Sequence, residues 1–356
     1  MTTRNCIYIS FVGVLFLAFS SCSIFKTKQI ANNELVIFPS PPDTARVQFL
    51  TSISTSKDIE KKQSSFSAFV LGENEAKTIY KPYGIDVHGG KIYICDSPIK
   101  GLEIIDLEKE TFEYFIPKGK GELALPVNCS VDENGYIYIA DVQRRQIVVF
   151  DHEGIFIESY GEKENFKPTD VFVTKDKIWV VNSENHRVSV YNKDNYNLLY
   201  YFPKSETGDD GFLYSPTNIS ISDEKVYVSD FGDFKIKVYT HDGNFINSIG
   251  SYGKRPGQFV RPKGVAVDKN SNLYVVDAGF ENTQIFNKDG NLLMFFGGSY
   301  TGSGYMWLPA KVLIDYDHLR YFEKYVDKSY HLKYLIFVTN QYGPDKINIY
   351  GSVEPK

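Results

Sequence analysis

Hydrophobic and polar residues alternate in short runs along most of the chain, and the same arrangement returns six times. Each return begins with a proline and continues as a run with the period of two that is typical of a half-buried strand. The six runs start at Pro82 (PYGIDV), Pro126 (PVNCSV), Pro168 (PTDVFV), Pro216 (PTNISI), Pro262 (PKGVAV) and Pro309 (PAKVLI). Successive prolines are 42 to 48 residues apart, which indicates a repeat protein.

Each repeat contains further strands of the same kind. A second run ends in an acidic or amide residue, at Asp96, Asp141, Asn182, Asp230, Asp277 and Asn340. A third run follows, and five of the repeats continue into a fourth. Four antiparallel strands at a period of about 45 residues are typical of one propeller blade. The pattern therefore predicts an all-β chain that folds as a six-bladed β-propeller with four-stranded antiparallel blades.

The last repeat departs from the others at two places. It stops after its third strand, and the run at residues 46–53 has the pattern of the missing outer strand. We expect this N-terminal strand to complete the last blade, which would close the ring and cover an exposed edge. Residues 317–333 lengthen the first hairpin of the same blade. Their apolar residues have helical spacing, which predicts a short helix packed on the ring.

The first residues have the pattern of an export signal. Arg4 precedes an apolar run over residues 7–19, which is short for a membrane span, and a loose bacterial lipobox leads to Cys22. We expect residues 1–21 to be a lipoprotein signal peptide, Cys22 to carry the lipid, residues 22–45 to form a tether and residues 46–356 to form the propeller. This predicts a protein exported to the bacterial cell envelope and lipid-anchored to a membrane, facing the periplasm or in the outer membrane. The alternative is an ordinary cleaved signal that contains a cysteine.

Composition and net charge disfavour nucleic acid as a partner. The 356 residues have a formal net charge of −5, and 15% of them are aromatic. A mildly acidic chain has no general attraction for phosphate backbones, so we expect no nucleic-acid partner. Removal of the signal and lipidation of Cys22 leave Cys95 and Cys129, both within apolar strands. Two interpretations fit Cys95 and Cys129, a pair of small buried thiols or a disulfide.

The acidic or amide residue at the end of each second strand has two interpretations. In the first, its side chain binds backbone donors of its own blade. In the second, several carboxylates converge on a divalent cation at the central channel, a metal site that needs unpaired oxygens at one point. The histidines do not recur at one position of the repeat, which disfavours a three-histidine zinc site. The sequence predicts no catalytic residues.

Candidate binding residues come from the longer loops, because binding groups favour variable loops on a rigid scaffold. In a propeller, the loops after the second strands and the connections between blades lie on one face. Arginine together with aromatic residues is the composition of interface hot spots. On this basis the candidates are Arg145, Arg187, Tyr252, Arg255, Tyr305 and Trp307.

The repeat unit is similar to the NHL repeat. Its pattern is Pro-x-Gly followed by a strand, then Ile/Leu-Tyr-x-x-Asp, then a basic residue before a third strand. Residues 262–277 (PKGVAVDKNSNLYVVD) and 136–154 (YIYIADVQRRQIVVFDHEG) match it best. The last repeat resembles that of exported bacterial NHL lipoproteins. The resemblance implies a propeller fold and leaves the activity open, because such propellers include binding modules, scaffolds and a few enzymes.

The first functional hypothesis is a monomeric, non-catalytic propeller that binds an envelope protein or peptide and is attached to the membrane by its lipid. One alternative is an enzyme or small-ligand binder at the channel mouth, lyase-like or hydrolase-like, with a divalent cation. Another is a purely structural member of a larger envelope complex.

Overall fold

The computed structural model describes residues 35–61, 75–162, 164–222 and 225–356. The expected signal peptide, Cys22 and the first part of the expected tether lie outside these residues. The described chain consists of six antiparallel sheets with five short 3-10 turns. None of its helices is both long and apolar enough to cross a membrane.

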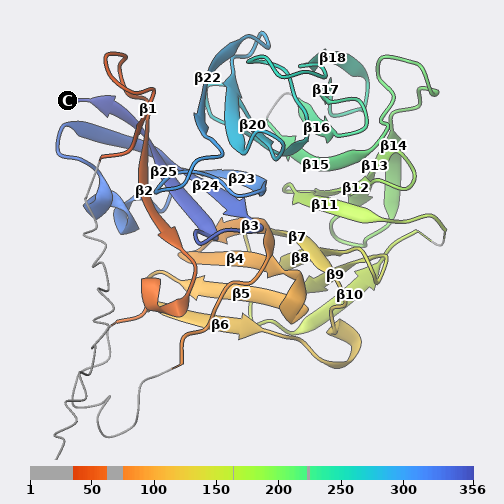
Figure 1. Ribbon diagram of the computed structural model, residues 1–356. Helices are drawn as coiled ribbons and strands as arrows, with labels where there is room; N and C mark the ends of the chain where they lie inside the picture. Colours follow the sequence, from red (N-terminus) through yellow and green to blue (C-terminus); the bar gives the residue numbers. More distant parts are fainter. Residues whose placement is uncertain (1–34, 62–74, 163, 223–224) are drawn as a thin grey trace, which may run out of the picture. The chain divides into compact units, whose positions relative to one another are not determined.

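The six sheets are the predicted blades, and strands follow one another across each sheet from the centre outward (Figure 1). The first strands are β3 (Pro82–His88), β7 (Pro126–Val131), β11 (Pro168–Val173), β15 (Pro216–Ile221), β19 (Pro262–Val267) and β23 (Pro309–Asp315). The second strands are β4 (Lys91–Asp96), β8 (Ile137–Asp141), β12 (Lys177–Asn182), β16 (Val226–Asp230), β20 (Leu273–Asp277) and β24 (Tyr330–Asn340). The third strands are β5 (Gly101–Asp106), β9 (Gln146–Phe150), β13 (Arg187–Asn192), β17 (Lys235–Tyr239), β21 (Asn282–Phe286) and β25 (Ile347–Pro355). The outer strands are β6 (Thr111–Phe115), β10 (Phe156–Tyr160), β14 (Leu198–Phe202), β18 (Phe245–Ile249), β22 (Leu292–Gly297) and β2 (Val47–Ile53).

The first strands form a closed ring around the centre. Each of them contacts the first strand of the next blade, in the order β3, β7, β11, β15, β19, β23 and back to β3. The buried apolar side chains form clusters between neighbouring blades. Trp179 of blade three, for example, belongs to one cluster with Ile219 and Tyr239 of blade four. The flat sheets are therefore held face to face by burial of apolar surface.

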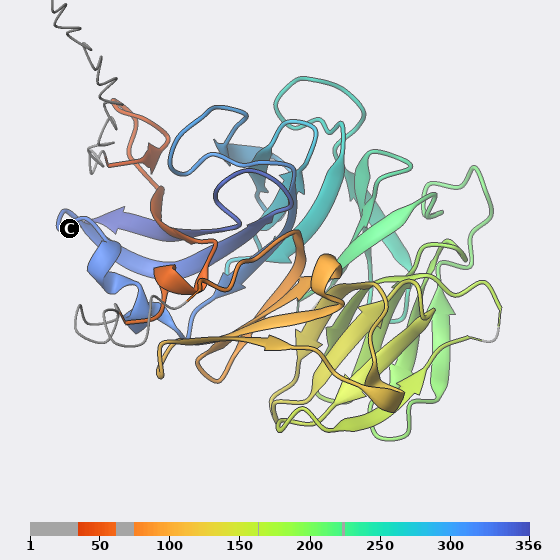
Figure 2. The same cartoon turned by 60° about the horizontal axis from the view of Figure 1, so that its bottom comes forward.

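The ring closes as the sequence predicts. Strand β2 pairs with the C-terminal strand β25 and completes the sixth blade (Figure 2). A fifth strand, β1 (Ile37–Phe38), pairs with β2 on the outside. This short strand falls within the stretch expected to be a tether, so the chain already joins the propeller before residue 46.

The short helix expected in the insertion of blade six takes the form of two 3-10 turns, η4 (Leu319–Tyr321) and η5 (Glu323–Tyr325). Phe322, between them, is buried, and its ring centroid lies 5.8 Å from that of Phe337. Tyr321 and Val326 are partly buried and pack against the same core cluster as Phe322, so the turns cover the blade through three apolar side chains.

Cys95 and Cys129 are free thiols, and both are buried in the described structure. They occupy strands β4 and β7, and the Cys129 thiol lies 3.8 Å from the Tyr93 carbonyl oxygen. The first of the two interpretations of this pair, small buried side chains, fits the structure.

Candidate binding face and central channel

One edge of every blade carries the loops in which the candidate residues lie. The proline that starts each first strand is opposite the acidic or amide residue that ends the second strand, as in Pro126–Asp141 and Pro216–Asp230. The start of each third strand is likewise paired with the end of the outer strand, as in Ile236–Ile249. The loops after the second strands and the connections between blades therefore lie at the same edge. We call the surface that they form the loop face.

The acidic or amide residues at the ends of the second strands hold this face together. All six are buried. Asp141 accepts hydrogen bonds from the backbone N–H groups of Ala124, Leu125 and Arg144, at 2.7 to 3.1 Å. Equivalent bonds from the preceding connection reach Asp96, Asn182, Asp230, Asp277 and Asn340. These side chains are thus structural, because each satisfies buried backbone donors of its own blade.

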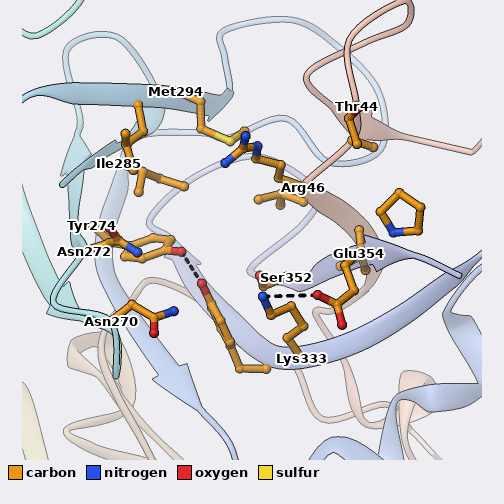
Figure 3. Close-up of a pocket in the computed structure, with 16 residues that line it drawn as sticks. Thr44, Arg46, Asn270, Asn272, Tyr274, Ile285, Met294, Lys333, Ser352 and Glu354 are labelled. Carbon is orange, nitrogen blue, oxygen red and sulfur yellow. Dashed lines mark hydrogen bonds and ion pairs between the residues drawn. The ribbon is translucent and has the colours of Figure 1, made fainter.

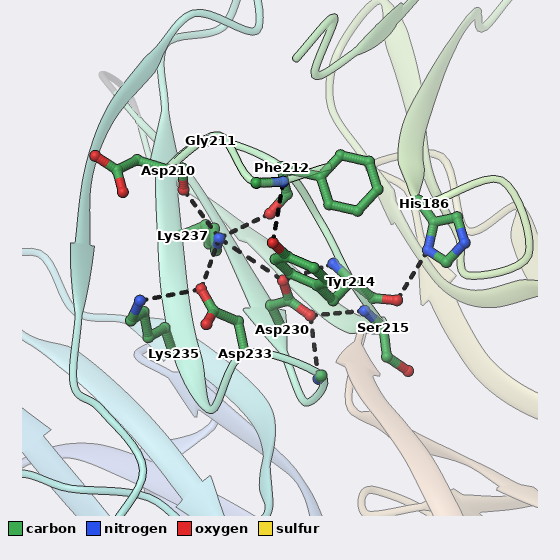
Figure 4. A network of polar contacts seen from close by, with 12 residues as sticks. His186, Asp210, Gly211, Phe212, Tyr214, Ser215, Asp230, Asp233, Lys235 and Lys237 are labelled. Atoms are coloured by element: carbon green, nitrogen blue, oxygen red, sulfur yellow. Dashed lines mark hydrogen bonds and ion pairs between the residues drawn. The ribbon is translucent and has the colours of Figure 1, made fainter. Parts of the chain in front are cut away.

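A second set of buried polar side chains, on the third strands, fixes the same connections from the other side. Lys237 of β17 is the most elaborate case (Figure 4). Its ammonium group donates to the carbonyl oxygens of Asp210 at 2.9 Å and Phe212 at 2.7 Å, and it lies 2.8 Å from Asp233 Oδ2. Gln284 and Asn348 donate to connection carbonyls at the same register in blades five and six.

These contacts set the charge state of the neighbouring acids. Burial raises the pKa of Asp230, against the effect of its backbone hydrogen bonds. Burial also acts to raise the pKa of Asp233, but hydrogen bonds from Lys237 and Lys235 outweigh it and leave that pKa lowered. Lys237 was not singled out from the sequence. The available signal was a lysine in the middle of a third strand, at the position that holds Gln284 and Asn348 in blades five and six.

Three of the six histidines make polar contacts with neighbouring backbone or side-chain atoms. His186 Nδ1 lies 2.8 Å from the Tyr214 carbonyl oxygen (Figure 4), and His241 Nε2 lies 2.9 Å from the Ser222 carbonyl oxygen. His318 Nδ1 lies 2.9 Å from Asp315 Oδ1. In the part of the chain that the structure describes, no three His, Cys, Asp or Glu side chains are grouped closely enough to hold a metal ion.

Exposed aromatic side chains gather on the loop face. They come from five connections and loops around the ring, and their exposed fractions run from 39% to 70%. These residues are Tyr80, Phe231, Tyr252, Tyr300 and Tyr342. Exposed apolar groups gathered on one face are typical of interaction sites, so the loop face is the candidate contact surface.

The six candidate binding residues fall into three separate groups on this face. Arg145 and Arg187 belong to blades two and three, and both are already paired. Arg145 lies 2.5 Å from Glu184, and Arg187 pairs with Glu162 and lies over the Tyr201 ring. The two arginines are not at equivalent positions of the repeat, because Arg145 corresponds to His186, which like Arg145 has a positive φ just before the third strand.

The other two groups are more accessible. Tyr252 and Arg255 are exposed in the connection between blades four and five, and the Tyr252 ring lies 4.8 Å from that of Phe234. Tyr305 and Trp307 are half-buried in the connection between blades five and six. The Trp307 indole N–H is buried and has no hydrogen-bond partner among the described residues. These two groups, and not the arginines of blades two and three, remain free to contact a partner.

The central channel is closed by a charged pair that crosses the ring. Lys311 of blade six reaches Asp170 of blade three, with Nζ 2.5 Å from Oδ2. Asp170 also accepts hydrogen bonds from Asn218 and from the Ile219 backbone N–H. A cavity of about 60 Å³ remains among the first strands. Burial raises the pKa of Asp86, which lines this cavity, to about 6.

A larger cavity lies at the opposite edge of the blades, where the ring closes (Figure 3). It has a volume of about 340 Å³ and lies between blade five and the closing strands β2 and β25. Ile285 and Met294 line it, and the hydroxyl groups of Tyr274 and Tyr334 are 2.6 Å apart at one side. Arg46 extends over it with no ion-pair partner among the described residues.

Comparison with known proteins identifies the fold. Residues 201–351 match the family DUF5128, described as a 6-bladed beta-propeller. None of the curated proteins matches the chain. The solved structures that resemble it include virginiamycin B lyase from Staphylococcus aureus, with a TM-score of 0.54 and 15% identity, over 77% of this chain and 95% of the lyase.

Two further structures are similar over most of the chain. A protein of unknown function from Bacteroides thetaiotaomicron has a TM-score of 0.59 and 14% identity, over 87% of this chain and 76% of that protein. A gluconolactonase from Xanthomonas campestris has a TM-score of 0.56 and 15% identity, over 87% of this chain and 90% of the enzyme. This chain is a six-bladed β-propeller. At such identities the likeness concerns the fold alone, because one fold supports many functions.

Proposed function

We propose that the protein is a lipid-anchored envelope lipoprotein whose propeller binds a protein partner through the loop face, without catalysis. The observation that carries the proposal is the set of exposed aromatic side chains, Tyr80, Phe231, Tyr252, Tyr300 and Tyr342, on that face. Aromatic residues are enriched in protein interfaces and supply much of the binding free energy there.

The rigidity of the loops supports this role. The backbone of each connection is bonded to a buried side chain of its own blade, as with Asp141 and Lys237. A surface that is already ordered loses little conformational entropy on binding, so more of the contact energy appears as affinity. Tyr252 and Tyr300 are thus presented by loops that need not fold when a partner arrives.

Anchoring at the envelope rests on the N-terminal sequence. Arg4, the apolar run and the lipobox at Cys22 favour export and lipidation, and the repeat resembles that of exported NHL lipoproteins. Several acyl chains on Cys22 would bind the bilayer stably, at about 0.8 kcal/mol for each buried CH₂ group. The propeller would then act beside the membrane and not within it.

The loop face is tested by site-specific photocrosslinking of the full-length protein in its native membranes. A crosslinking residue at position 252 or 300 should capture one protein partner, and mass spectrometry should place the crosslink on the same segment of that partner. The same residue at position 199, exposed on the outer strand β14 away from the loop face, is the matched control. Equal capture from all three positions, or from none, would contradict the proposal.

The anchor is tested separately by fractionation. The variant Cys22→Ser should leave the membrane fraction, while an unmodified protein should stay there and label with a radioactive fatty acid. A variant that still remains with the membrane would show that Cys22 is not the anchor.

A catalytic role at the channel mouth is the alternative, because virginiamycin B lyase and a gluconolactonase share the fold. A divalent cation there would need unpaired carboxylates. The described residues of the channel instead include Lys263 and Lys311, and the carboxylate of Asp170 is already paired. We therefore favour binding over metal-dependent catalysis.

A further inference from the structure

Six residues, one from each blade, lie near the loop-face end of the central channel. They are the second residues of the six first strands, directly above the pair formed by Lys311 and Asp170. Going round the ring, they are Tyr83, Val127, Thr169, Thr217, Lys263 and Ala310. Lys263 is the only charged residue in this ring.

Lys263 is a buried cation that lacks an anionic partner. Its exposed fraction is 8%, so more than nine-tenths of it is buried. Its ammonium group lies 4.6 Å from the centre of the Tyr83 ring, across the small side chain of Ala310 in the intervening blade. Among the described residues it makes no other polar contact. An aromatic ring compensates a buried charge only in part, because a cation–π contact contributes about 1 to 2 kcal/mol.

Further positive charge surrounds Lys263, and this charge is also unpaired. Arg261 and Lys81 are exposed at the rim, and neither forms an ion pair with a described residue; the Lys81 ammonium lies over the Tyr342 ring at 5.2 Å. Burial lowers the pKa of Lys263 to about 8, and the charges of Arg261 and Lys81 contribute to this. Three cations that repel one another are costly unless an anion joins them.

The nearby polar groups do not supply that anion. Asp170 is already held by Lys311, Asn218 and a backbone N–H group. Thr217, next to Lys263 in the ring, has a buried hydroxyl group with no hydrogen-bond partner among the described residues. The mouth therefore offers an ammonium group and a hydroxyl group that both lack an acceptor.

We propose that Lys263 and Thr217, with Arg261 and Lys81 at the rim, form a binding site for a small oxyanion, a carboxylate or a phosphate, at the mouth of the channel. The oxyanion accepts hydrogen bonds from Lys263 and Thr217, and its charge offsets the repulsion among the three cations. The Tyr83 and Tyr342 rings provide flat walls beside it. The site shares Tyr342 with the aromatic set of the loop face, but the observations at Lys263 and Thr217 that carry it are separate from that set. Its charge is opposite to that of the divalent-cation site considered from the sequence.

The test follows the ionisation of Lys263 directly. Full-length protein in detergent is labelled with ¹³C at the lysine ε-carbon, and the Lys263 signal is assigned by its absence in Lys263→Met. In sodium chloride, the signal should titrate with a midpoint near 8. In inorganic phosphate or acetate at the same ionic strength, the midpoint should rise toward 10.5, the ordinary lysine value. A response to phosphate alone or to acetate alone assigns the class of anion, and no response to either overturns the proposal.

Two variants and one control locate the effect. The affinity for the responding anion, measured from the shift of the thermal midpoint, should fall about tenfold or more in Lys263→Met and less in Arg261→Gln. Arg46→Gln removes an unpaired exposed arginine at the cavity of Figure 3, and it should bind the anion as the unmodified protein does. Unchanged affinity in both Lys263→Met and Arg261→Gln, or equal loss in Arg46→Gln, would contradict the proposal. Because Arg261 is exposed, its variant keeps the test valid if Lys263→Met fails to fold.

Discussion

Blades four and five each contain a buried lysine, and the two differ in the partners of their ammonium groups. Lys237 is 1% exposed and is surrounded by two carbonyl oxygens and the carboxylate of Asp233. Lys263, in the next blade, is 8% exposed and contacts only the face of Tyr83 among the described residues. A buried ammonium group is stable when the fold supplies its acceptors and costly when it does not.

The difference separates a structural group from a candidate functional one. Two donors of Lys237 hold the connection between blades three and four, and the third pairs with Asp233 in the loop after β16, so this lysine has no donor left for a ligand. The ammonium group of Lys263, at the mouth of the channel, donates no hydrogen bond to a described residue. Both lysines are buried within similar blades, so burial does not distinguish them. The partners of their ammonium groups do.

The largest effect is expected when the satisfied lysine is removed. Lys237→Met should lower the free energy of unfolding by about 4 kcal/mol, because Asp233 and two carbonyl groups lose a buried partner. Urea unfolding at pH 7 measures it. Lys235→Met is the matched control, because Lys235 pairs with the same Asp233 from a more exposed position and should cost less than about 1 kcal/mol. Equal losses for the two variants would break the comparison.

Lys263, which has no anionic partner among the described residues, should make the free energy of unfolding depend on pH. A lysine whose folded pKa is about 8 binds fewer protons in the folded protein than in the unfolded chain between pH 8 and 10.5, so stability should rise with pH across that range. The gain is at most about 3 kcal/mol. Lys263→Met should remove this slope and should be at least as stable as the unmodified protein at pH 7. Unfolding at several pH values, without phosphate or carboxylate buffers, measures it, and a steep fall in stability at pH 7 would show that the ammonium group has partners.

The carboxylates at the ends of the second strands should behave like Lys237. Asp141→Ala leaves three backbone N–H groups without an acceptor and should cost about 2 kcal/mol. Hydrogen exchange should also become faster in the preceding connection, at residues 119–125. Asp151→Ala removes a carboxylate from an exposed hairpin and should change both quantities less. No difference between the two variants would contradict the structural role of Asp141.

The smallest effect concerns Glu103, which occupies in blade one the register that Lys237 occupies in blade four. It is fully buried, and neither of its carboxyl oxygens accepts a hydrogen bond from a described residue. Burial, followed by the negative charge of Asp96, raises the pKa of Glu103 well above its ordinary value. An acid of this kind binds more protons when folded, so its contribution is complete below about pH 4.5 and is lost as pH rises toward the raised pKa.

Glu103→Gln keeps the shape and removes the ionisation. We expect this variant to be more stable than the unmodified protein at pH 7, by about 1 kcal/mol, and equally stable at pH 4. Thermal unfolding at the two pH values measures it. Glu113→Gln on the exposed outer strand of the same blade is the control and should change neither value. A loss of stability in Glu103→Gln at pH 7 would mean that the charged carboxylate is required.

Much of the fold could be predicted because its signals are local and repeated. The alternation after Pro126 or Pro216, and the acidic or amide residue that ends the next strand, recur six times and define both the strands and their pairing. The closing strand at residues 46–53 was predictable for the same reason. The short helix expected in residues 317–333 is present as two 3-10 turns with Phe322 packed on the blade, and only the 3-10 geometry could not be predicted from the helical spacing.

The candidate residues were predictable only as members of a face. The loop positions of Tyr252, Arg255, Tyr305 and Trp307 follow from the repeat. The pairing of Arg145 with Glu184 does not, because it joins loops of two blades 39 residues apart. Sequence alone therefore gave no means of separating the accessible candidates from those already paired.

The sequence by itself determined the number of blades, the order of strands and the face on which each loop lies, because these depend on short-range alternation and turns. Only the tertiary structure decided that Lys311 reaches Asp170 across the ring and that Lys263 reaches Tyr83 with no acid beside it. Both contacts join residues more than 100 positions apart, and they form only when six blades close around one axis. The sequence signal for them is slight: Lys263 stands where the neighbouring repeats have threonine and alanine, and Lys311 stands where they have glycine. The meaning of each lysine depends on the partners that ring closure brings near it or leaves out.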